Sequence, residues 1–520
     1  MRQEEGKIKV DRDLEYNSRW MSHEIGVDQS FDAIRREFEI GGRKTVMFFM
    51  DGFVKDEVME RVLSRFSVLE PQDLRPHVFK NIFKKYLTYI EVETTDDLKK
   101  ALDMLLAGPL ILFIDGIEEA IVIDVREYPV RSPEEPDLER VVRGSRDGFV
   151  ETIVFNTALI RRRVRDPKLR MEMLQVGTRS RSDVCLSYIK DIANPRLVAS
   201  IKEKIQQINI DGIPMAEKSI EELIAPGNFW NPFPRVRYTE RPDVAANHLL
   251  EGHLLVIVDT SPSVIILPVT LWHHLQHAEE FRQAPAVGVF MRWLRYIYVL
   301  LSVLIMPTWL LVATNPRFLP ESLSFIGPTK SGHVGLFFQF LFAELGINLM
   351  RIAAVHTPDA LTTSLGIIAA VLIGEIAVSV GLFTSEVVLY TAIAAVSIFA
   401  TPSQELGQAN TLVRVFLLLG VGLFGLPGFA AAMLSVIFLL LTTKSFGIPY
   451  LWPLVPLNLS ALRDVLIRPP IPTQNLRLSI LNPQDVKSQT TPGRAMAKPI
   501  PSEDGEDGGS NRSRKRKKRR

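Results

Sequence analysis

The uncharged stretch IYVLLSVLIMPTWLLVA, Ile297–Ala313, is the strongest fold signal in this chain of 520 residues. Its 17 residues would form a helix about 26 Å long, enough to cross the hydrocarbon core of a bilayer. From Ile297 to Thr443 ten of 147 residues are charged, against 23% in the whole chain. We therefore predict a membrane-spanning second half after a polar first half. A single soluble globule and a disordered chain are both excluded.

Two more apolar segments follow this one. Leu361–Ala400 has two charges in 40 residues and is expected to form two spans with a break near Gly381–Glu386. Val415–Thr443 is interrupted by Pro427–Gly428, so it is either one kinked helix or two short ones. Basic residues flank both ends of the apolar half, and the positive-inside rule puts both ends on the cytoplasmic side. The number of crossings is then even: four, with breaks or re-entrant pieces, or six.

The polar half has the patterns of an α/β protein. Short apolar runs such as Thr45–Phe49 and Leu110–Ile114 are typical of strands, whereas Leu98–Leu106 has the spacing of an amphipathic helix. The fold class that we predict is an α/β cytoplasmic region of two subdomains followed by an all-α transmembrane bundle. Its predicted parts are a loose polar lead at 1–30, the subdomains at 31–150 and 151–290, the bundle at 291–460, and a cytoplasmic, disordered basic tail at 461–520.

Charge and cysteine content exclude several classes of protein. Eight of the last nine residues are Lys or Arg, and without them 53 basic residues stand against 59 acidic ones. The main body is therefore no nucleic-acid binder by charge, and the tail is expected to be attracted to the anionic leaflet of the bilayer. The basic run Arg161–Arg163 with Arg165 is expected on an intersubunit or solvated surface. Cys185 is the single cysteine, which excludes an internal disulfide and a cysteine zinc cluster.

The best candidate for a pore is the segment Glu386–Ala400, EVVLYTAIAAVSIFA. A ring of glutamates at its beginning would concentrate cations, and the two valines that follow would form an apolar constriction that closes by dewetting. Small and hydroxyl side chains would line the rest of a narrow path. The alternative is a capped helix with ordinary small-residue packing. The pore-lining residues of this hypothesis are Glu386, Val387, Val388, Thr391, Ala394 and Ser397.

Ionisable residues in the apolar half are informative because each is costly in lipid and should face protein or water. Glu344, Asn348 and Arg351 form one stripe of a helix predicted over Val334–Val355. This stripe is either a gating or coupling surface against the soluble region, or the polar face of an interfacial helix in which Glu344 and Arg351 are partly paired. Glu375, deep in a span, is either a structural hydrogen-bonding residue or a proton-sensitive or ion-contacting group of the same gating set.

No sequence motif indicates catalysis, and we expect no enzyme activity, no cofactor and no metal site. The G-x-G-x-x-G at Gly420–Gly425 lies inside an apolar stretch rather than after a soluble strand, so its glycines are expected to allow close helix packing. His273, His277 and Glu280 share a helix face that zinc could use. No cysteine is near them, and packed or solvated histidines are the favoured interpretation.

Several long motifs carry a family resemblance. They are RSPEEPDLERVVRGSRDGFVE at Arg131–Glu151, NTALIRRRVRDPKL with VGTRS and IANP between Asn156 and Pro195, PFPRVRYTERPD at Pro232–Asp243, and SFGIPYLWPLVP at Ser445–Pro456. With these motifs the chain resembles the GerA family of bacterial spore germination proteins, in its A-subunit form, over about residues 35–465. It departs from the family where D-G-T-P-F and S-P-E-D-Y-Y are usual, at Asp259–Ser263 and Gln276–Phe281.

The resemblance implies a multi-pass protein of the spore inner membrane with both termini on the cytoplasmic side, which is the spore core. It implies a homo-oligomer, a pentamer by resemblance, that conducts cations and releases ions early in germination or amplifies that signal. The implied partners are the lipid bilayer and a small membrane partner subunit or other germination proteins, without nucleic acid. Two alternatives stay open: a non-conducting scaffold that assembles other germination proteins, and a secondary transporter, whose inverted repeat is not seen.

Overall fold

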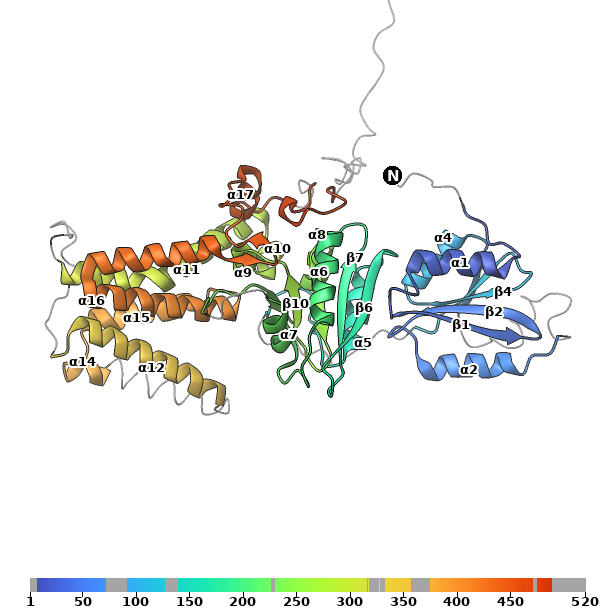
Figure 1. Cartoon of the computed structure of the whole chain (residues 1–520), viewed down its shortest axis with the longest axis horizontal. Coiled ribbons are helices and arrows are strands. Elements are labelled where there is room, and N and C mark those ends of the chain that lie inside the picture. Colours follow the sequence, from blue (N-terminus) through green and yellow to red (C-terminus); the bar gives the residue numbers. More distant parts are fainter. Residues whose placement is uncertain are drawn as a thin grey trace, which may run out of the picture.

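The computed structural model describes residues 7–71, 91–126, 139–225, 230–315, 317, 327, 333–356, 375–470 and 475–488. Two α/β subdomains and a helical bundle follow one another along the long axis of the molecule (Figure 1). The first subdomain lies at one end, the bundle at the other, and the second subdomain between them. The predicted fold class, an α/β region followed by apolar helices, is confirmed.

The first subdomain is a five-stranded antiparallel sheet, in the order β1-β2-β4-β5-β3, with helices on both faces. Because successive side chains of a strand point to opposite faces, Phe48 packs with helices α1 and α4, whereas Met47 packs under α2. Its elements are α1 (Leu14–Ile25), β1 (Ala33–Ile40), β2 (Arg43–Met50), α2 (Asp56–Ser67), β3 (Val92–Thr95), α4 (Leu98–Leu106), β4 (Leu110–Ile114) and β5 (Ala120–Ile123).

Helix α1 shows that the prediction of a loose lead at residues 1–30 is wrong for its second half. The side chain of Asp13 caps the helix by accepting a hydrogen bond from the backbone N–H of Glu15, and Gly26 ends it with φ 68°. Met21 and Ile25 are buried in the core of the first subdomain. The overall polarity of the segment hid this helix, because only one narrow stripe of it is apolar.

The second subdomain repeats the architecture of the first. Its sheet order, β6-β7-β9-β10-β8, is again first, second, fourth, fifth and third in chain order. Thr95–Asp115 and Thr239–Asp259 align without a gap, and each contains a helix, a glycine and a fully buried strand. Helices α5 and α8 cover one face of the sheet, and α6 and α7 cover the other. The elements are α5 (Ile153–Arg163), β6 (Leu169–Val176), β7 (Ser182–Ile189), α6 (Pro195–Gln206), α7 (Ala216–Ile224), β8 (Arg237–Thr239), α8 (Pro242–Glu251), β9 (Leu254–Val258) and β10 (Val264–Leu267).

A buried ion pair joins the two subdomains. Arg161, on α5, donates from Nε to Oδ2 of Asp32 over 2.8 Å, and both side chains are at most 3% exposed. Arg163 instead pairs with Asp147 at 2.6 Å. The expectation that this basic run lies on an intersubunit or solvated surface is therefore wrong for Arg161, which is buried inside one chain.

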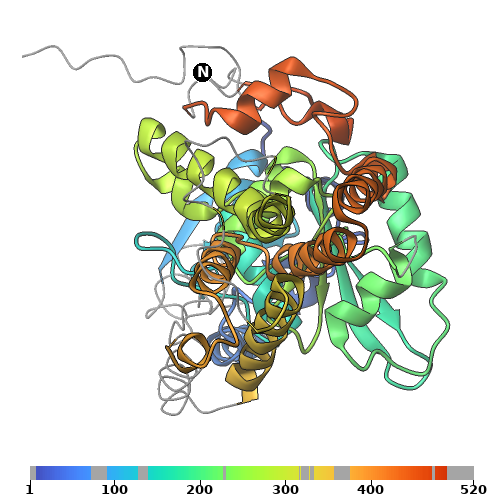
Figure 2. The ribbon, with the colours of Figure 1, turned by 90° about the vertical axis from the view of Figure 1, so that its left-hand side faces the viewer.

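The apolar half forms a bundle of helices that Figure 2 shows nearly end-on. Among the residues that the structure describes, three helices, α11, α12 and α16, are long and apolar enough to cross a membrane, and α15 is a shorter apolar helix. The predicted break near Gly381–Glu386 is confirmed, because Gly381 has φ 73° in the turn between α14 and α15. Residues 361–374 of the same predicted segment lie outside the described residues. The bounds are α9 (Leu271–Leu275), α10 (Ala278–Arg282), α11 (Pro285–Thr314), α12 (Leu336–His356), α14 (Ala377–Ser379), α15 (Ser385–Ile398) and α16 (Gln404–Thr442).

Helix α16 reverses direction at Gly425, where φ is 61° and ψ is −137°. Its two halves then pack closely, since a Cβ added to Gly420 would lie 2.8 Å from the carbonyl oxygen of Gly428. Both ends of the helix contact the second subdomain: Ser403 Oγ lies 3.2 Å from His274 Nδ1, and Thr443 Oγ1 accepts a hydrogen bond from Asn231. Of the two predicted alternatives, the structure has two helices, and the glycines allow the close approach that we expected.

The chain after α16 returns to the second subdomain. A short hairpin of β11 (Lys444–Ser445) and β12 (Ile448–Pro449) is followed by α17 (Leu459–Leu466). Farther on, Arg477 Nε donates to the carbonyl of Leu250 over 2.7 Å. The prediction of a disordered tail from residue 461 is therefore wrong for 461–470 and 475–488, which pack on the folded chain. The basic run at 512–520 lies outside the described residues.

Candidate functional site

A buried ion pair connects three helices inside the apolar bundle. Arg414, on α16, donates from Nη2 and Nε to the two carboxylate oxygens of Glu344 on α12, over 2.6 and 3.1 Å. Its third donor, Nη1, bonds the carbonyl of Ser302 on α11. Asn348 Nδ2 lies 3.0 Å from Glu344 Oε1 and completes the shell. Because both charges are at most 3% exposed, each depends on the other for its solvation.

The structure brings together only some of the four predicted gating or coupling residues, which are Glu344, Asn348, Arg351 and Glu375. Glu344 and Asn348 meet, but Glu344 pairs with Arg414 and not with Arg351, so the pairing along one helix that the second of the two interpretations included is not formed. Arg351 is half-buried and has no ion-pair partner among the described residues. Glu375 is exposed, just before α14.

Arg414 was missed by the sequence reasoning, although one signal was available. It is the one charged residue between Glu405 and Lys444. A lone arginine in an apolar stretch needs a buried acid, and Glu344 was already a candidate. The two could have been paired on charge alone.

Helix α15 presents most of the predicted pore-lining residues to the interior of the protomer. Val387, Thr391, Ala394 and Ser397 are buried, and Val387 and Ala394 belong to one core cluster with Trp309 of α11. Glu386 and Val388 are half-buried. The exposed face of α15 is apolar and carries Leu389 and Val396, with Phe399 just after the helix.

A second set of buried charges lies where α10 meets α11. Glu280 is fully buried and forms ion pairs with Arg292 and Arg295. Arg292 also donates to the carbonyl of Val465 on α17 over 2.8 Å, and Arg468 donates to the carbonyl of Glu280 over 2.7 Å. These contacts bind the base of α11 to the segment that follows the bundle, so both ends of the apolar half are joined at one place.

The second subdomain contacts the bundle through α9. Arg237 of β8 pairs with Glu139 at 3.0 Å and donates to the carbonyl of His273 over 2.8 Å. His274 contacts Ser403, in the turn between α15 and α16. We call residues 271–282, with the turn 399–403 and α17, the joint. A small cleft at this contact is lined by residues including Tyr238, Ser263, Pro402, Gln404 and Glu405.

The histidines of the joint are held neutral. Burial, together with the charge of Arg237 and against the opposing hydrogen bond to the backbone of Pro234, lowers the pKa of His274 to about 3. Burial also lowers the pKa of His277, whose Nδ1 accepts the N–H of Glu279 and caps α10. The zinc-like set considered from the sequence, His273 with His277 and Glu280, is not assembled, because Glu280 is bound by arginines.

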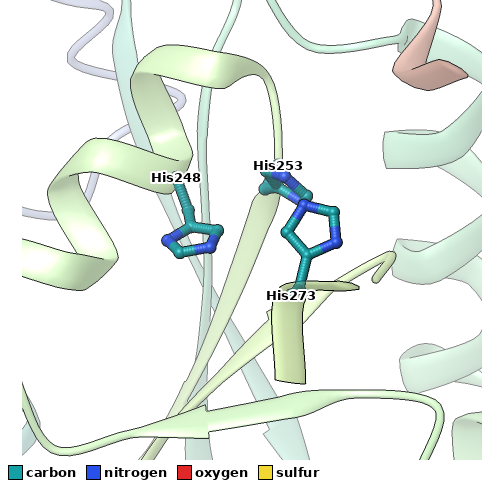
Figure 3. Close-up of side chains that lie close together, drawn as sticks. All are labelled: His248, His253 and His273. Atoms are coloured by element: carbon teal, nitrogen blue, oxygen red, sulfur yellow. The ribbon is translucent and has the colours of Figure 1, made fainter. Parts of the chain in front are cut away.

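His273 instead approaches two other histidines of the second subdomain (Figure 3). One ring nitrogen each from His248, His253 and His273 lie within 4.8 Å of one another. Sequence spacing did not indicate this set, because α8, the start of β9 and α9 meet only in the folded subdomain. Among the described residues it is the one His, Cys, Asp or Glu cluster with the spacing of a metal site.

Known proteins resemble this chain over most of its length. Residues 21–480 match the family described as Bacillus/Clostridium GerA spore germination protein. Stage V sporulation protein AF of Bacillus subtilis (strain 168) is 45% identical over 487 residues, covering 94% of this chain and 99% of the relative. Spore germination protein GerLA of Bacillus cereus is 30% identical over 445 residues, covering 84% of this chain and 90% of the relative.

One solved structure is also similar. The N-terminal domain of the A subunit of the Bacillus megaterium spore germinant receptor GerK3 is 26% identical, with a TM-score of 0.40, and the match covers 50% of this chain and 96% of that chain. The family resemblance carried by the sequence motifs is confirmed by the match over residues 21–480. On that match, and on a relative 45% identical over nearly its whole length, the chain belongs to the GerA family of spore germination proteins.

Proposed function

We propose that this chain assembles into an oligomeric cation channel that releases ions early in spore germination or amplifies that signal. The observation that carries the proposal is the Glu344–Arg414 pair, held by the carbonyl of Ser302 inside an apolar bundle. Ionisable residues at such depth are costly, and in membrane proteins they mark ion pathways or elements that move. The ion pair would hold the bundle in its closed state and would break when the channel opens.

The joint supports a coupling role for the soluble region. His274 contacts the turn that connects α15 with α16, and Glu280 pairs with Arg292 and Arg295 of α11. A displacement of α9 or α10 would therefore move the bases of three apolar helices together. We infer that the two subdomains transmit a signal to the bundle through the joint.

The pore itself is proposed along α15. In a ring of subunits, Glu386 at the beginning of this helix would concentrate cations, and Val388 would form the constriction. Thr391 and Ser397 are buried in the protomer, so they would contribute after a rotation of α15. Glu375 would remain a second acidic group near the same end of the bundle.

The proposed location is the spore inner membrane, with both termini on the cytoplasmic side. The chain enters the bundle at α11 and leaves it after α16, and both points contact the second subdomain, through Leu275 and Asn231. The proposed partners are the lipid bilayer, further copies of the chain as a pentamer, and a small membrane subunit or other germination proteins. Large exposed apolar residues on α12 and α16, such as Leu345 and Phe424, fit lipid or a neighbouring copy.

A non-conducting scaffold that assembles other germination proteins is the second candidate. The face of α15 that is exposed in the protomer is largely apolar, with Leu389 and Val396, while the hydroxyl residues Thr391 and Ser397 are buried. An apolar exterior of this kind suits a helix that packs against other membrane proteins. Unless α15 rearranges, this face provides no hydrated surface along which ions could move.

Ion flux separates the two candidates. The purified full chain is reconstituted in liposomes loaded with K⁺, and K⁺ release is recorded together with the oligomeric mass of the detergent-solubilised protein. A channel gives protein-dependent release that Arg414→Gln alters, whereas Glu118→Gln, on the exposed surface of the first subdomain, leaves release unchanged. Correctly inserted oligomers that release no K⁺ above empty liposomes would leave the scaffold as the function.

A further inference from the structure

Three histidines from three different elements converge in the second subdomain, beside the joint (Figure 3). His248 is on α8, His253 lies directly before β9, and His273 is on α9. Their ring centroids are 5.0, 5.0 and 5.9 Å apart. None of these imidazoles takes part in the ion pairs described above.

Hydrogen bonds at Nδ1 hold two of the three rings, His248 and His253, in the tautomer whose Nε2 carries a lone pair. His248 Nδ1 donates to the carbonyl of Val244, and His253 Nδ1 donates to the carbonyl of Pro268, each over 2.8 Å. An imidazole held at Nδ1 by a carbonyl presents the lone pair of Nε2, which is the usual arrangement behind a metal-ligating histidine.

His273 has the opposite tautomer in this structure. Its Nδ1 accepts the backbone N–H of Thr270 over 3.0 Å and lies 2.9 Å from Thr270 Oγ1, so the proton of the neutral ring is on Nε2. Binding of a metal at Nε2 would displace that proton. Nδ1 could then carry a proton and donate it to Thr270 Oγ1, and the Thr270 N–H would lose its acceptor.

The cluster leaves one polar atom without a partner. His253 is 1% exposed, and its Nε2 has no hydrogen-bond partner in the part of the chain that the structure describes. Burying such an atom unsatisfied costs about 1–3 kcal/mol. A ligand that accepts this lone pair would remove the penalty.

All three rings are neutral at pH 7, as metal binding requires. Burial lowers the pKa of His253 to about 4, and burial together with the neighbouring imidazoles holds the pKa of His248 and of His273 well below 6.5. The charge of Arg237 also disfavours protonation. That charge is balanced by the carboxylate of Glu139 at 3.0 Å, so it does not by itself prevent a cation from binding.

We propose that His248, His253 and His273 bind one divalent transition-metal ion of the zinc class. Three neutral imidazoles suit Zn²⁺, Co²⁺, Ni²⁺ or Cu²⁺, whereas Mg²⁺ and Ca²⁺ need oxygen ligands, which the cluster does not contain. Around a tetrahedral zinc the ligand nitrogens are about 3.3 Å apart. In this structure the three ligand nitrogens lie within 4.8 Å of one another. Side-chain rotation would have to bring them closer together by up to about 1.5 Å to bind the ion.

The ion would fasten α9 to the second subdomain. His273 is on α9, and the other two ligands come from α8 and the beginning of β9. The same short helix carries His274, which contacts the turn between α15 and α16, and its Leu271 N–H bonds the carbonyl of Tyr450. Metal binding would therefore stiffen the joint, whether or not the bundle conducts ions.

Zinc content tests the proposal directly. The purified full chain in detergent is incubated with ZnCl₂ and desalted, and its zinc is measured by elemental analysis. We expect one zinc per chain, with affinity at least about tenfold lower in His248→Gln and in His253→Gln. His274→Gln is the matched control. It removes a buried imidazole from α9, the helix that carries His273, but not from the cluster, so this variant should retain the zinc.

Two further measurements keep the test independent of folding defects. Co²⁺ in place of Zn²⁺ should give the intense visible absorption of a tetrahedral site in the wild type and in His274→Gln only. Zinc should raise the midpoint of thermal unfolding of the wild type but not of His248→Gln. The proposal is wrong if the wild-type protein retains no zinc after desalting, or if all the variants retain as much zinc as the wild type. The three imidazoles would then be packed together without binding a metal.

Discussion

The carboxylate of Glu344 and the guanidinium of Arg414 meet through two hydrogen bonds, 2.6 and 3.1 Å long, although they are 70 residues apart in the chain. The carbonyl of Ser302 accepts a third bond from the same guanidinium. One arginine therefore holds α11, α12 and α16 together. In an apolar bundle such a contact is either fully formed or fully broken, because a half-formed pair would leave a charge in lipid.

Breaking this pair should destabilise the bundle strongly. Glu344→Gln leaves the charge of Arg414 buried without a counterion, and we expect a loss of about 3–5 kcal/mol, read as a lower midpoint of thermal unfolding in detergent. Arg351→Gln is the control, since Arg351 is half-buried on the same helix and has no ion-pair partner among the described residues. Equal effects of the two variants would contradict a special role for the Glu344–Arg414 pair.

The reversal of α16 should depend on small residues at its crossing. A Cβ on Gly428 would overlap Gly420 and its carbonyl oxygen, so Gly428→Ala should cost about 1–3 kcal/mol through overpacking. Gly335→Ala should be nearly neutral, because the nearest atom to its new Cβ would be 3.9 Å away. Thermal unfolding of the two variants in detergent makes the comparison. A neutral Gly428→Ala would show that the two halves of α16 are farther apart.

The joint should loosen when Glu280 loses its charge. Glu280→Gln leaves Arg292 and Arg295 without their shared counterion, and the turn before α11 should become more accessible to protease. Limited proteolysis of the full chain in detergent, followed by mass spectrometry of the fragments, measures this. The exposed pair Arg463–Asp464 provides the control, since Arg463→Gln should change stability by less than about 0.5 kcal/mol.

The two valines at the beginning of α15 should behave differently. Val387 is fully buried against α11, so Val387→Ala should lower stability by about 1–3 kcal/mol through lost burial. Val388 is half-buried, and Val388→Ala should change ion release from liposomes with little change in stability. Glu386→Gln should reduce the preference for cations. If ion release and selectivity are those of the wild type in both Val388→Ala and Glu386→Gln, α15 does not line the pore.

Acid should weaken the second subdomain through Asp147. Burial alone would raise the pKa of this carboxyl, but hydrogen bonds from Arg163 and Ser145 and the charge of Arg163 hold it below 3.8. The contribution to stability is then complete above the unfolded pKa and is lost as the pH falls through the lower folded-state value. Asp147→Asn should lower the unfolding midpoint at pH 7, and the difference from wild type should shrink toward pH 3. A difference that does not change with pH would contradict this linkage.

Local patterns predicted individual elements well. The helix Leu98–Leu106 and the strand Leu110–Ile114 have the bounds that periodicity indicated, because their apolar spacing and flanking turn residues are local properties. The prediction failed at α1, where a polar segment forms a helix with only its inner stripe buried. It also failed along 475–488, whose contacts are to residues such as Leu250 and Ile192, far away in the chain.

The sequence alone also identified the family, because long motifs can be recognised without knowing how the chain is arranged in space. It identified the separation of a polar half from an apolar half, because hydropathy and charge are properties of composition.

Partners across the fold required the tertiary structure. Arg414 meets Glu344, Asp32 meets Arg161, and His273 meets His248 and His253, only because packed helices and sheets bring distant residues together. No local spacing encodes these pairings. The hydrogen-bonding partner of a buried polar group comes from the element that packs against it, and the complete fold determines which element that is.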